Sequence, residues 1–278
     1  MSGDSCDDAA VQRPYRIMGV LNVTPDSFSD GGRFLDAQAA IAHGLAMEAA
    51  GADILDVGGE STRPGAEAVA PEEQIRRVVP AIEGLVARGV RAQISIDTTR
   101  RAVAEAAVAA GARYVNDVTA FRQDPDLAGL VADRGLDCCL MHMRGEPRSM
   151  QRDPVYDDVV ADVKAFLEER LATAVAAGIA EQRIMLDPGI GFGKTVEHNL
   201  ELLRRLDELV ALGRPVVVGT SRKSFLGRLT GREADDRLAG TIATNVLAFE
   251  RGASVFRVHD VGPVADALAV TAATVRGR

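Results

Sequence analysis

Three polar residues, Asp97, Asn116 and Asp187, each stand at the end of a short apolar run. Two carboxylates and an amide can accept several hydrogen bonds. Charge-assisted hydrogen bonds of this kind offset the desolvation cost of a flat heterocycle that carries several N–H donors. Each residue alone also fits a capping role: Asp97 precedes a predicted helix, and Asp187 precedes a turn. Together the three favour a binding pocket for a nitrogen heterocycle.

A second set of residues is suited to an anion. Arg63, Arg257 and His259 supply positive charge, and the segment 221–224 (SRKS) precedes a predicted helix. Fixed cations and the N–H groups of a helix N-terminus together favour phosphate or diphosphate. His259 by itself also fits a structural histidine, and it belongs to no cluster with metal-ligand spacing.

The segment 184–195 (IMLDPGIGFGKT) changes from an apolar run to a glycine-rich turn and then to a helical pattern. It predicts a strand that ends at Asp187, a sharp loop and a helix. Gly193 and Lys194 look like the end of a phosphate-binding loop, but that loop needs a longer spacer after its first glycine than Gly189 provides. The spacing therefore argues against a nucleoside triphosphatase of this class.

The elements that must position these residues alternate along the chain. Short apolar runs predict strands near 15–21, 53–57, 92–97, 113–116, 137–141, 183–187, 215–219 and 254–258. Amphipathic, alanine-rich segments predict helices near 36–50, 71–88, 99–110, 125–135, 155–177, 196–212, 222–229 with 235–251, and 263–276. Eight units with strands this apolar predict a parallel sheet closed on itself. The expected fold is α/β, a single-domain (β/α)8 TIM barrel, and an open doubly wound sheet is the structural alternative.

Length and composition agree with one domain, because 278 residues that are 47% hydrophobic suffice for an α/β barrel. Residues 1–14 lack periodicity and are expected to form a mobile N-terminal tail before a barrel domain over 15–278.

The sequence contains neither a membrane-length apolar run nor a secretory signal, so we expect a cytoplasmic protein. A net charge of −8 and a pI near 5.1 argue against nucleic-acid and membrane partners. Cys138 and Cys139 are neighbours that would point to opposite faces of a strand, which indicates buried apolar roles rather than metal ligation.

The polar residues that interrupt this pattern fall at the C-terminal ends of the predicted strands. They are Asn22, Asp56 with Glu60, Asp97, Asn116 with Asp117, His142, Asp187, Ser221 with Lys223, and Arg257 with His259. In a barrel these ends share one rim, so residues far apart in sequence converge on one mouth, which indicates an enzyme. The glycine-rich loops 24–33 and 58–70 are expected to close over the substrate, unless they are ordinary surface loops.

The candidate residues lie within distinctive motifs. These are 18–32 (MGVLNVTPDSFSDGG), 56–65 (DVGGESTRPG), 95–98 (SIDT), 116–118 (NDV), 140–145 (LMHMRG), 187–194 (DPGIGFGK), 219–224 (GTSRKS) and 257–260 (RVHD). With these motifs the chain resembles the dihydropteroate synthase family from about residue 15 to its C-terminus. The resemblance implies a pterin-binding transferase of folate biosynthesis that joins 6-hydroxymethyl-7,8-dihydropterin diphosphate to 4-aminobenzoate. It also implies a homodimer and a target of sulfonamides.

The resemblance further implies roles for single residues. The pterin would be held by Asp97, Asn116, Asp187 and Lys223, with Phe192 and Met141 packed against it. The diphosphate would be bound by Asn22, Arg63, Arg257 and His259, and Asn22 would also contact a Mg²⁺ cofactor. The aminobenzoate pocket would be lined by Phe28, Thr62, Pro64, Phe192 and Ser224. The residues expected to be catalytic are Asp97, Lys223, Arg257 and His259.

The mechanism implied by the family is dissociative: diphosphate leaves first, and the aromatic amine then attacks a pterin methylene cation. Such a reaction needs leaving-group stabilisation more than a base. One alternative is a pterin-dependent methyltransferase that serves a corrinoid, which would share the pterin residues but has no use for the segments 24–28 and 221–224. Another is a non-catalytic pterin-binding protein or an inactive paralogue, which would bind pterin without releasing diphosphate.

Overall fold

The computed structural model describes residues 13–24, 32–61, 68–145 and 150–276, and for residues 32–36 and 276 the backbone alone. The tail expected over 1–14 lies outside these residues apart from Arg13 and Pro14. Arg13 Nη2 lies 2.5 Å from Asp53 Oδ1, so the described chain starts with a residue attached to the barrel. None of the described helices is long and apolar enough to cross a membrane.

Eight parallel strands form one sheet that curls into a nearly closed barrel. They are β1 (Arg16–Asn22), β2 (Ile54–Gly58), β3 (Gln93–Asp97), β4 (Tyr114–Asp117), β5 (Asp137–Met141), β6 (Ile184–Asp187), β7 (Val217–Val218) and β8 (Val255–Val258). The order β6-β5-β4-β3-β2-β1-β8-β7 leaves β6 and β7 at the ends of the sheet, and a parallel bridge between Leu186 and Val216 joins them. This closure confirms the predicted TIM barrel and excludes the open doubly wound sheet.

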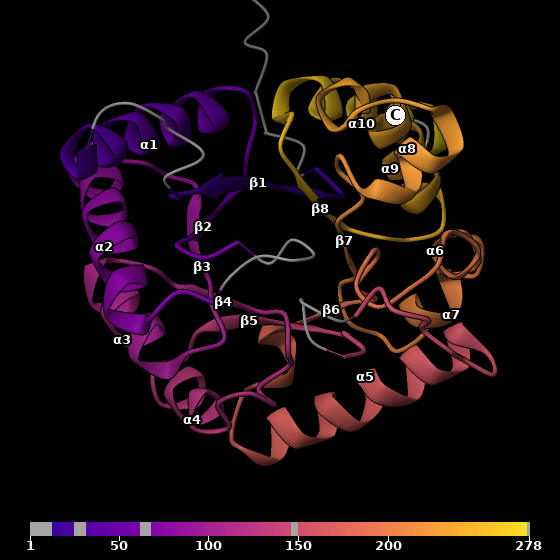
Figure 1. Ribbon diagram of the computed structural model, residues 1–278, viewed down its shortest axis with the longest axis horizontal. Helices are drawn as coiled ribbons and strands as arrows, with labels where there is room; N and C mark the ends of the chain where they lie inside the picture. The colour runs from indigo at the N-terminus through magenta and orange to yellow at the C-terminus, as the bar shows by residue number, and fades with distance from the viewer. Residues whose placement is uncertain (1–12, 25–31, 62–67, 146–149, 277–278) are drawn as a thin grey trace, which may run out of the picture.

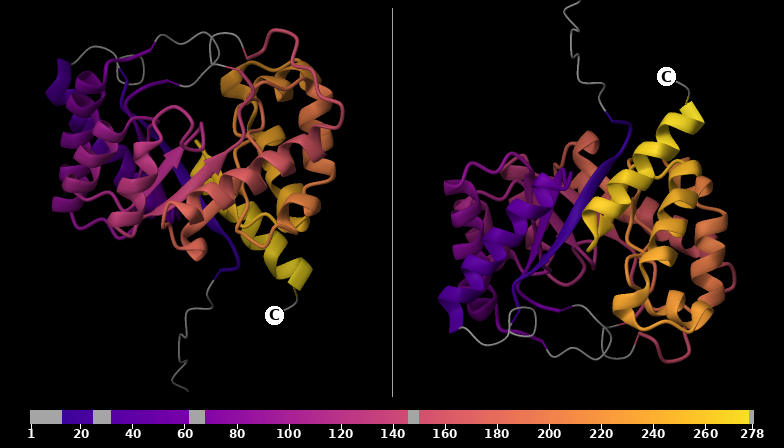
Figure 2. Two further views of the ribbon diagram at one scale, coloured as in Figure 1. Left: turned by 90° about the horizontal axis from the view of Figure 1, so that it is seen from below. Right: turned by 90° about the horizontal axis from the view of Figure 1, so that it is seen from above.

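Helices surround the strands on the outside, as the view in Figure 1 shows. They are α1 (Gly32–Ala49), α2 (Pro71–Ala87), α3 (Arg101–Ala110), α4 (Asp126–Asp133), α5 (Val159–Ala176), α6 (Val196–Arg204), α7 (Asp207–Val210), α8 (Ser224–Thr230), α9 (Leu238–Glu250) and α10 (Val261–Arg276). Figure 2 shows the same layering from two sides, with α9 and α10 adjacent.

One predicted helix is interrupted. The pattern over 196–212 predicts a continuous helix, but α6 and α7 are separated at Arg205, whose backbone leaves the helical region with φ −108° and ψ 30°. Leu206 and Leu209 are nevertheless both fully buried, so the interrupted segment still packs its apolar side against the core.

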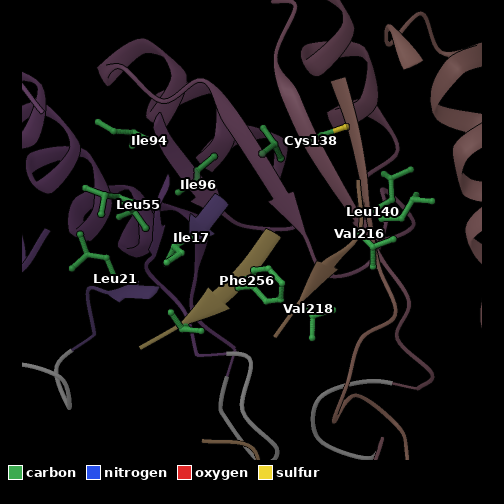
Figure 3. Close-up of a cluster of buried hydrophobic side chains, with 14 of the residues drawn as sticks. Ile17, Leu21, Leu55, Ile94, Ile96, Cys138, Leu140, Val216, Val218 and Phe256 are labelled. Carbon is green, nitrogen blue, oxygen red and sulfur yellow. The ribbon is translucent and has the colours of Figure 1, made fainter. Parts of the chain in front are cut away.

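Alternation along the strands separates two apolar layers. Side chains on the outer face of the strands pack under the helices, and Figure 3 shows Ile17, Leu55, Ile96 and Phe256 in this layer. The inner face fills the barrel with a second cluster made of Met18, Ile54, Tyr114, Cys139, Met185, Val217 and Val255. Cys138 lies in the outer layer and Cys139 in the inner one, which confirms their predicted opposite orientation.

The inner layer changes from apolar to polar toward the C-terminal ends of the strands. On β2, Asp56 follows Ile54 on the same face, and on β4, Asn116 follows Tyr114. The strand register then aligns the polar ends, since Asn22 lies opposite Gly58, Gly58 opposite Asp97, and Asp97 opposite Asn116. The apolar cluster thus forms a dry base, and the polar residues lie above it at one level.

Candidate active site

A cavity of about 680 Å³ opens above this base. It is lined by every described residue that the sequence assigned to the site: Asn22, Asp97, Asn116, Met141, Asp187, Phe192, Lys223, Ser224, Arg257 and His259. Four other assigned residues, Phe28, Thr62, Arg63 and Pro64, lie outside the described residues. The predicted convergence of strand ends on one mouth is therefore confirmed for the described part of the set.

The floor of the cavity is a hydrogen-bonded group that we call the floor cluster: Asp56, Asp97, Asn116 and Arg257. Arg257 Nε donates to Asp56 Oδ2 and Arg257 Nη2 to Asp97 Oδ2, both at 2.7 Å. Asn116 Nδ2 donates to Asp56 Oδ2 at 2.9 Å. The guanidinium therefore fixes two carboxylates that come from neighbouring strands.

Burial shifts the ionisation of this cluster. Desolvation raises the pKa of Asp97 to about 7, although the charge of Arg257 opposes the rise. For Arg257, burial alone would lower the pKa, but the charges of Asp56 and Asp97 outweigh it and the pKa is raised. Strongly shifted groups in a cleft are typical of a functional site.

Asp187 and the glycine-rich segment after it form one wall. Gly189 N–H donates to Asp187 Oδ1 at 2.7 Å, so this carboxylate does close the turn, as the alternative reading of the sequence predicted. It also lines the cavity, and burial raises its pKa while Gly189 and Lys223 oppose the rise. Asp187 therefore both closes the turn and lines the cavity.

Two positions in this wall require glycine, because the backbone there has a positive φ and lies too close to neighbouring atoms for a side chain. Gly189 has φ +67°, and a Cβ there would overlap the carbonyl oxygen of His142. Gly191 has φ +82°, and a Cβ there would lie 3.1 Å from Cδ of Lys223. The turn delivers Phe192 to the cavity, where the Lys223 ammonium lies 4.0 Å from the centre of its ring.

Lys194 lies behind this wall rather than in the cavity. Its side chain is 3% exposed, and Nζ contacts His142 Nδ1 at 2.9 Å and the Phe192 carbonyl at 3.0 Å. Burial lowers the pKa of Lys194 to about 7 and that of His142 to about 2. We call His142, Lys194 and the Phe192 carbonyl the loop anchor. These contacts agree with the spacing argument against a phosphate-binding loop.

The predicted anion turn, 221–224, follows β7 and forms a second wall that touches the first through Lys223 and Phe192. Arg222 has φ +58°, and its guanidinium is bound by both carboxylate oxygens of Asp260, at 3.0 and 2.6 Å. His259 Nδ1 lies 3.0 Å from Ser221 Oγ. Arg222 thus supports the turn, and Lys223 and His259 contribute to the cavity lining.

For a metal, the described lining offers one suitable oxygen ligand at the predicted place, the amide of Asn22 at the end of β1. The described residues contain no group of three or more His, Cys, Asp or Glu side chains arranged to hold an ion. Mg²⁺ keeps several waters and commonly binds through one protein oxygen and the phosphates of a substrate. Asn22 therefore fits a Mg²⁺ that arrives with a diphosphate.

Several supporting residues were not assigned from the sequence. Asn199 on α6 accepts a hydrogen bond from Gly191 N–H at 2.7 Å and is 2% exposed. Asp56 was placed on the rim but given no role. Glu233, Asp235 and Arg237 line the cavity from a short 3-10 helix (Ala234–Asp236) and its two flanking residues, after α8. Only Asp56 carried a signal, because it ends an apolar run inside a matching motif.

Comparison with known proteins gives a consistent picture. The family described as pterin binding enzyme matches residues 18–259. The dihydropteroate synthase of Escherichia coli K12 is 44% identical over 262 residues, which cover 94% of this chain and 92% of that protein. The Mycobacterium leprae dihydropteroate synthase is 49% identical over 267 residues, with 94% and 93% covered.

Solved structures agree in both fold and sequence. A Xanthomonas albilineans dihydropteroate synthase with 4-aminobenzoic acid superposes with a TM-score of 0.89 at 51% identity, covering 96% of this chain and 94% of that one. The same organism's enzyme in complex with 7,8-dihydropteroate gives a TM-score of 0.85 at 48% identity, covering 96% and 95%.

Proposed function

We propose a residue-by-residue assignment of the cavity from one premise: this chain belongs to the dihydropteroate synthase family, whose members are pterin-binding transferases of folate synthesis. Its reaction joins 6-hydroxymethyl-7,8-dihydropterin diphosphate to 4-aminobenzoate and yields 7,8-dihydropteroate and diphosphate. The observation that carries the assignment is the meeting of three acceptors, Asp97, Asn116 and Asp187, around one cavity above a dry base.

The pterin occupies the floor of the cavity. Asp97, Asn116 and Asp187 accept hydrogen bonds from its N–H groups, and Lys223 donates to its oxygen or ring nitrogen. Phe192 and Met141 pack against the ring. This role is supported by the burial of all three acceptors, because buried carboxylates that face N–H donors discriminate strongly against ligands without them.

The diphosphate lies toward the mouth, where Asn22, Arg63, Arg257 and His259 bind it. Within the described residues Arg257 is bonded through Nε and Nη2 only, so Nη1 is left for a phosphate oxygen. The aminobenzoate pocket is assigned to Phe28, Thr62, Pro64, Phe192 and Ser224. Support for this pocket comes from Phe192 and Ser224, which line the cavity near Lys223.

In the proposed mechanism the bond between the pterin methylene carbon and the diphosphate oxygen breaks first, and its electron pair leaves with the diphosphate. The neutral aryl amine then forms the C–N bond and releases its proton to solvent. Arg257 and His259 stabilise the leaving charge, and the carboxylates of Asp97 and Asp187 stabilise the transient cation. Mg²⁺, when bound at Asn22, would supply Lewis-acid stabilisation of the diphosphate.

The test is release of diphosphate from the pterin substrate, with and without 4-aminobenzoate and with and without Mg²⁺. We expect release that depends on Mg²⁺ and gives dihydropteroate when the amine is present. Pterin binding without release would instead favour an inactive paralogue or the methyltransferase, which a corrinoid methyl-transfer assay would identify.

A homodimer and a cytoplasmic location are also proposed, on the family resemblance alone. Size-exclusion chromatography with light scattering checks the first, and fractionation of expressing cells checks the second. A monomer that turns over at the full rate would contradict the dimer.

A further inference from the structure

Asp56 is the one member of the floor cluster to which the proposed function gives no role. Its side chain is fully buried at 0% exposure. It accepts hydrogen bonds from Ser95 Oγ at 2.6 Å, from Asn116 Nδ2 at 2.9 Å and from Arg257 Nε at 2.7 Å. A buried carboxylate that accepts from three different strands dictates how its partners are oriented.

The contact with Asn116 has a definite polarity. A carboxylate oxygen only accepts, so the Asn116 atom that lies 2.9 Å from Asp56 Oδ2 has to be the donating Nδ2. The amide oxygen is then turned away from Asp56. Asn116 lines the cavity. Among the described residues, the buried side-chain atoms that lack a hydrogen-bond partner do not include Asn116 Oδ1. This oxygen therefore faces the open cavity.

We propose that Asp56 is a positioning residue that sets the polarity of the cavity floor: it holds the Asn116 amide so that the acceptor Oδ1 faces the N–H edge of the pterin. The inference rests on the proposed function, since it assumes that Asn116 meets the pterin. Without Asp56 the amide is free to turn by half a rotation, and the turned amide presents a donor to a ligand edge that also donates. Arg257 strengthens the arrangement because it holds Asp56 and Asp97 with one guanidinium.

The test compares two substitutions that both remove the charge of Asp56. In Asp56→Asn the new amide oxygen still accepts from Asn116, and its nitrogen faces Ser95, whose hydroxyl can accept. In Asp56→Leu, of similar shape, no acceptor is left. Calorimetric titration with 6-hydroxymethyl-7,8-dihydropterin diphosphate should show affinity within about threefold of wild type for the first variant and a loss of about 10- to 100-fold for the second.

A second pair keeps the inference testable if Asp56→Leu does not fold. Asp56→Ala, which leaves room for water, is introduced into the wild-type chain and into Asn116→Ala. If Asp56 acts by orienting the Asn116 amide, Asp56→Ala should weaken pterin binding by at least about tenfold in the wild-type chain. In Asn116→Ala, which has no amide to orient, the same change should weaken binding by less than about threefold.

The matched control is Asp117→Asn. Asp117 is equally buried on β4 but faces away from the cavity, where it accepts from Thr119 and Phe121. This change should lower the melting temperature and leave the pterin affinity unchanged.

Each other outcome is decisive. Equal affinity in Asp56→Leu and wild type overturns the orienting role, and so does an equal loss from Asp56→Ala with and without the Asn116 amide. Equal losses in Asp56→Asn and Asp56→Leu show that charge and not orientation matters, which also overturns it. A wild-type chain that binds no pterin overturns the proposed function and this inference together, whereas normal wild-type binding and turnover leave the proposed function standing whatever the variants do.

Discussion

The floor cluster and the loop anchor are both groups of buried ionisable side chains beside one cavity, yet only the first opens on it. Asp97, Asn116 and Arg257 line the cavity, whereas His142 and Lys194 do not. In the floor cluster Arg257 binds both carboxylates, and of these Asp97 lines the cavity whereas Asp56 is fully buried. In the loop anchor the ammonium is used by His142 and the Phe192 carbonyl.

The difference teaches that burial of charge does not by itself identify a ligand site. Both groups have shifted pKa values, because burial favours the neutral form of each side chain. Burial raises the pKa of Asp97 to about 7 and lowers the pKa of Lys194 to about 7. The two groups differ in where their remaining hydrogen-bond donors and acceptors point. In the floor cluster they face the cavity, and in the loop anchor they hold the wall of the cavity.

The strongest way to break the floor cluster is Arg257→Met, which leaves Asp56 and Asp97 buried without their cation. Removal of one partner from a buried ion pair costs about 3–5 kcal/mol, so we expect a loss of stability of this size and loss of turnover. Urea unfolding followed by circular dichroism measures the first. Stability within about 1 kcal/mol of wild type would show that the carboxylates find another partner or take up protons.

Asp187→Asn should act on binding rather than on the fold. The amide can still accept from Gly189 N–H, but it presents a donor to the pterin, so we expect a loss of pterin affinity of about 10- to 100-fold. Calorimetric titration measures it, with the melting temperature as control. Near-normal affinity would remove Asp187 from the pterin site.

Titration of Asp97 should appear in the pH profile of pterin binding. Its pKa is raised to about 7 by burial, so below that pH the carboxyl is protonated and loses an acceptor. Affinity should therefore fall by up to about tenfold per pH unit as the pH drops below about 7. Asp97→Asn should bind weakly with a flat profile, and a profile that keeps the wild-type slope would assign the titration to another group.

Lys194→Met should give the smallest effect, seen in stability against pH. The folded pKa of Lys194 is lowered to about 7, so above that pH the unfolded chain holds more protons than the folded one and stability rises with pH. Between about pH 7 and 8 wild type should gain on the order of 1 kcal/mol that the variant does not. Parallel curves for the two proteins would mean that Lys194 keeps its ordinary pKa.

The strands, most helices and the rim positions could be predicted from local sequence patterns. Side-chain contacts between residues far apart in the sequence could not. Asp56 and Asn116 were placed at the rim because they fall at the C-terminal ends of short apolar runs, and the glycine spacing argued against a phosphate-binding loop. The bonds of Asp56, however, join it to Ser95, Asn116 and Arg257 across 39, 60 and 201 positions. Lys194 likewise meets His142 across 52 positions, so its role became visible only when the barrel had closed.

The short contact between β6 and β7 has a consequence for how the barrel opens. Strand β7 has two residues, and one bridge, Leu186 to Val216, joins it to β6 outside the regular ladders. Backbone amides along this seam should exchange with deuterium sooner than those between β1 and β2, where the ladder spans five residue pairs. Asp187 ends one side of the seam and Lys223 follows the other, so a bound pterin that contacts both would fasten it and slow that exchange.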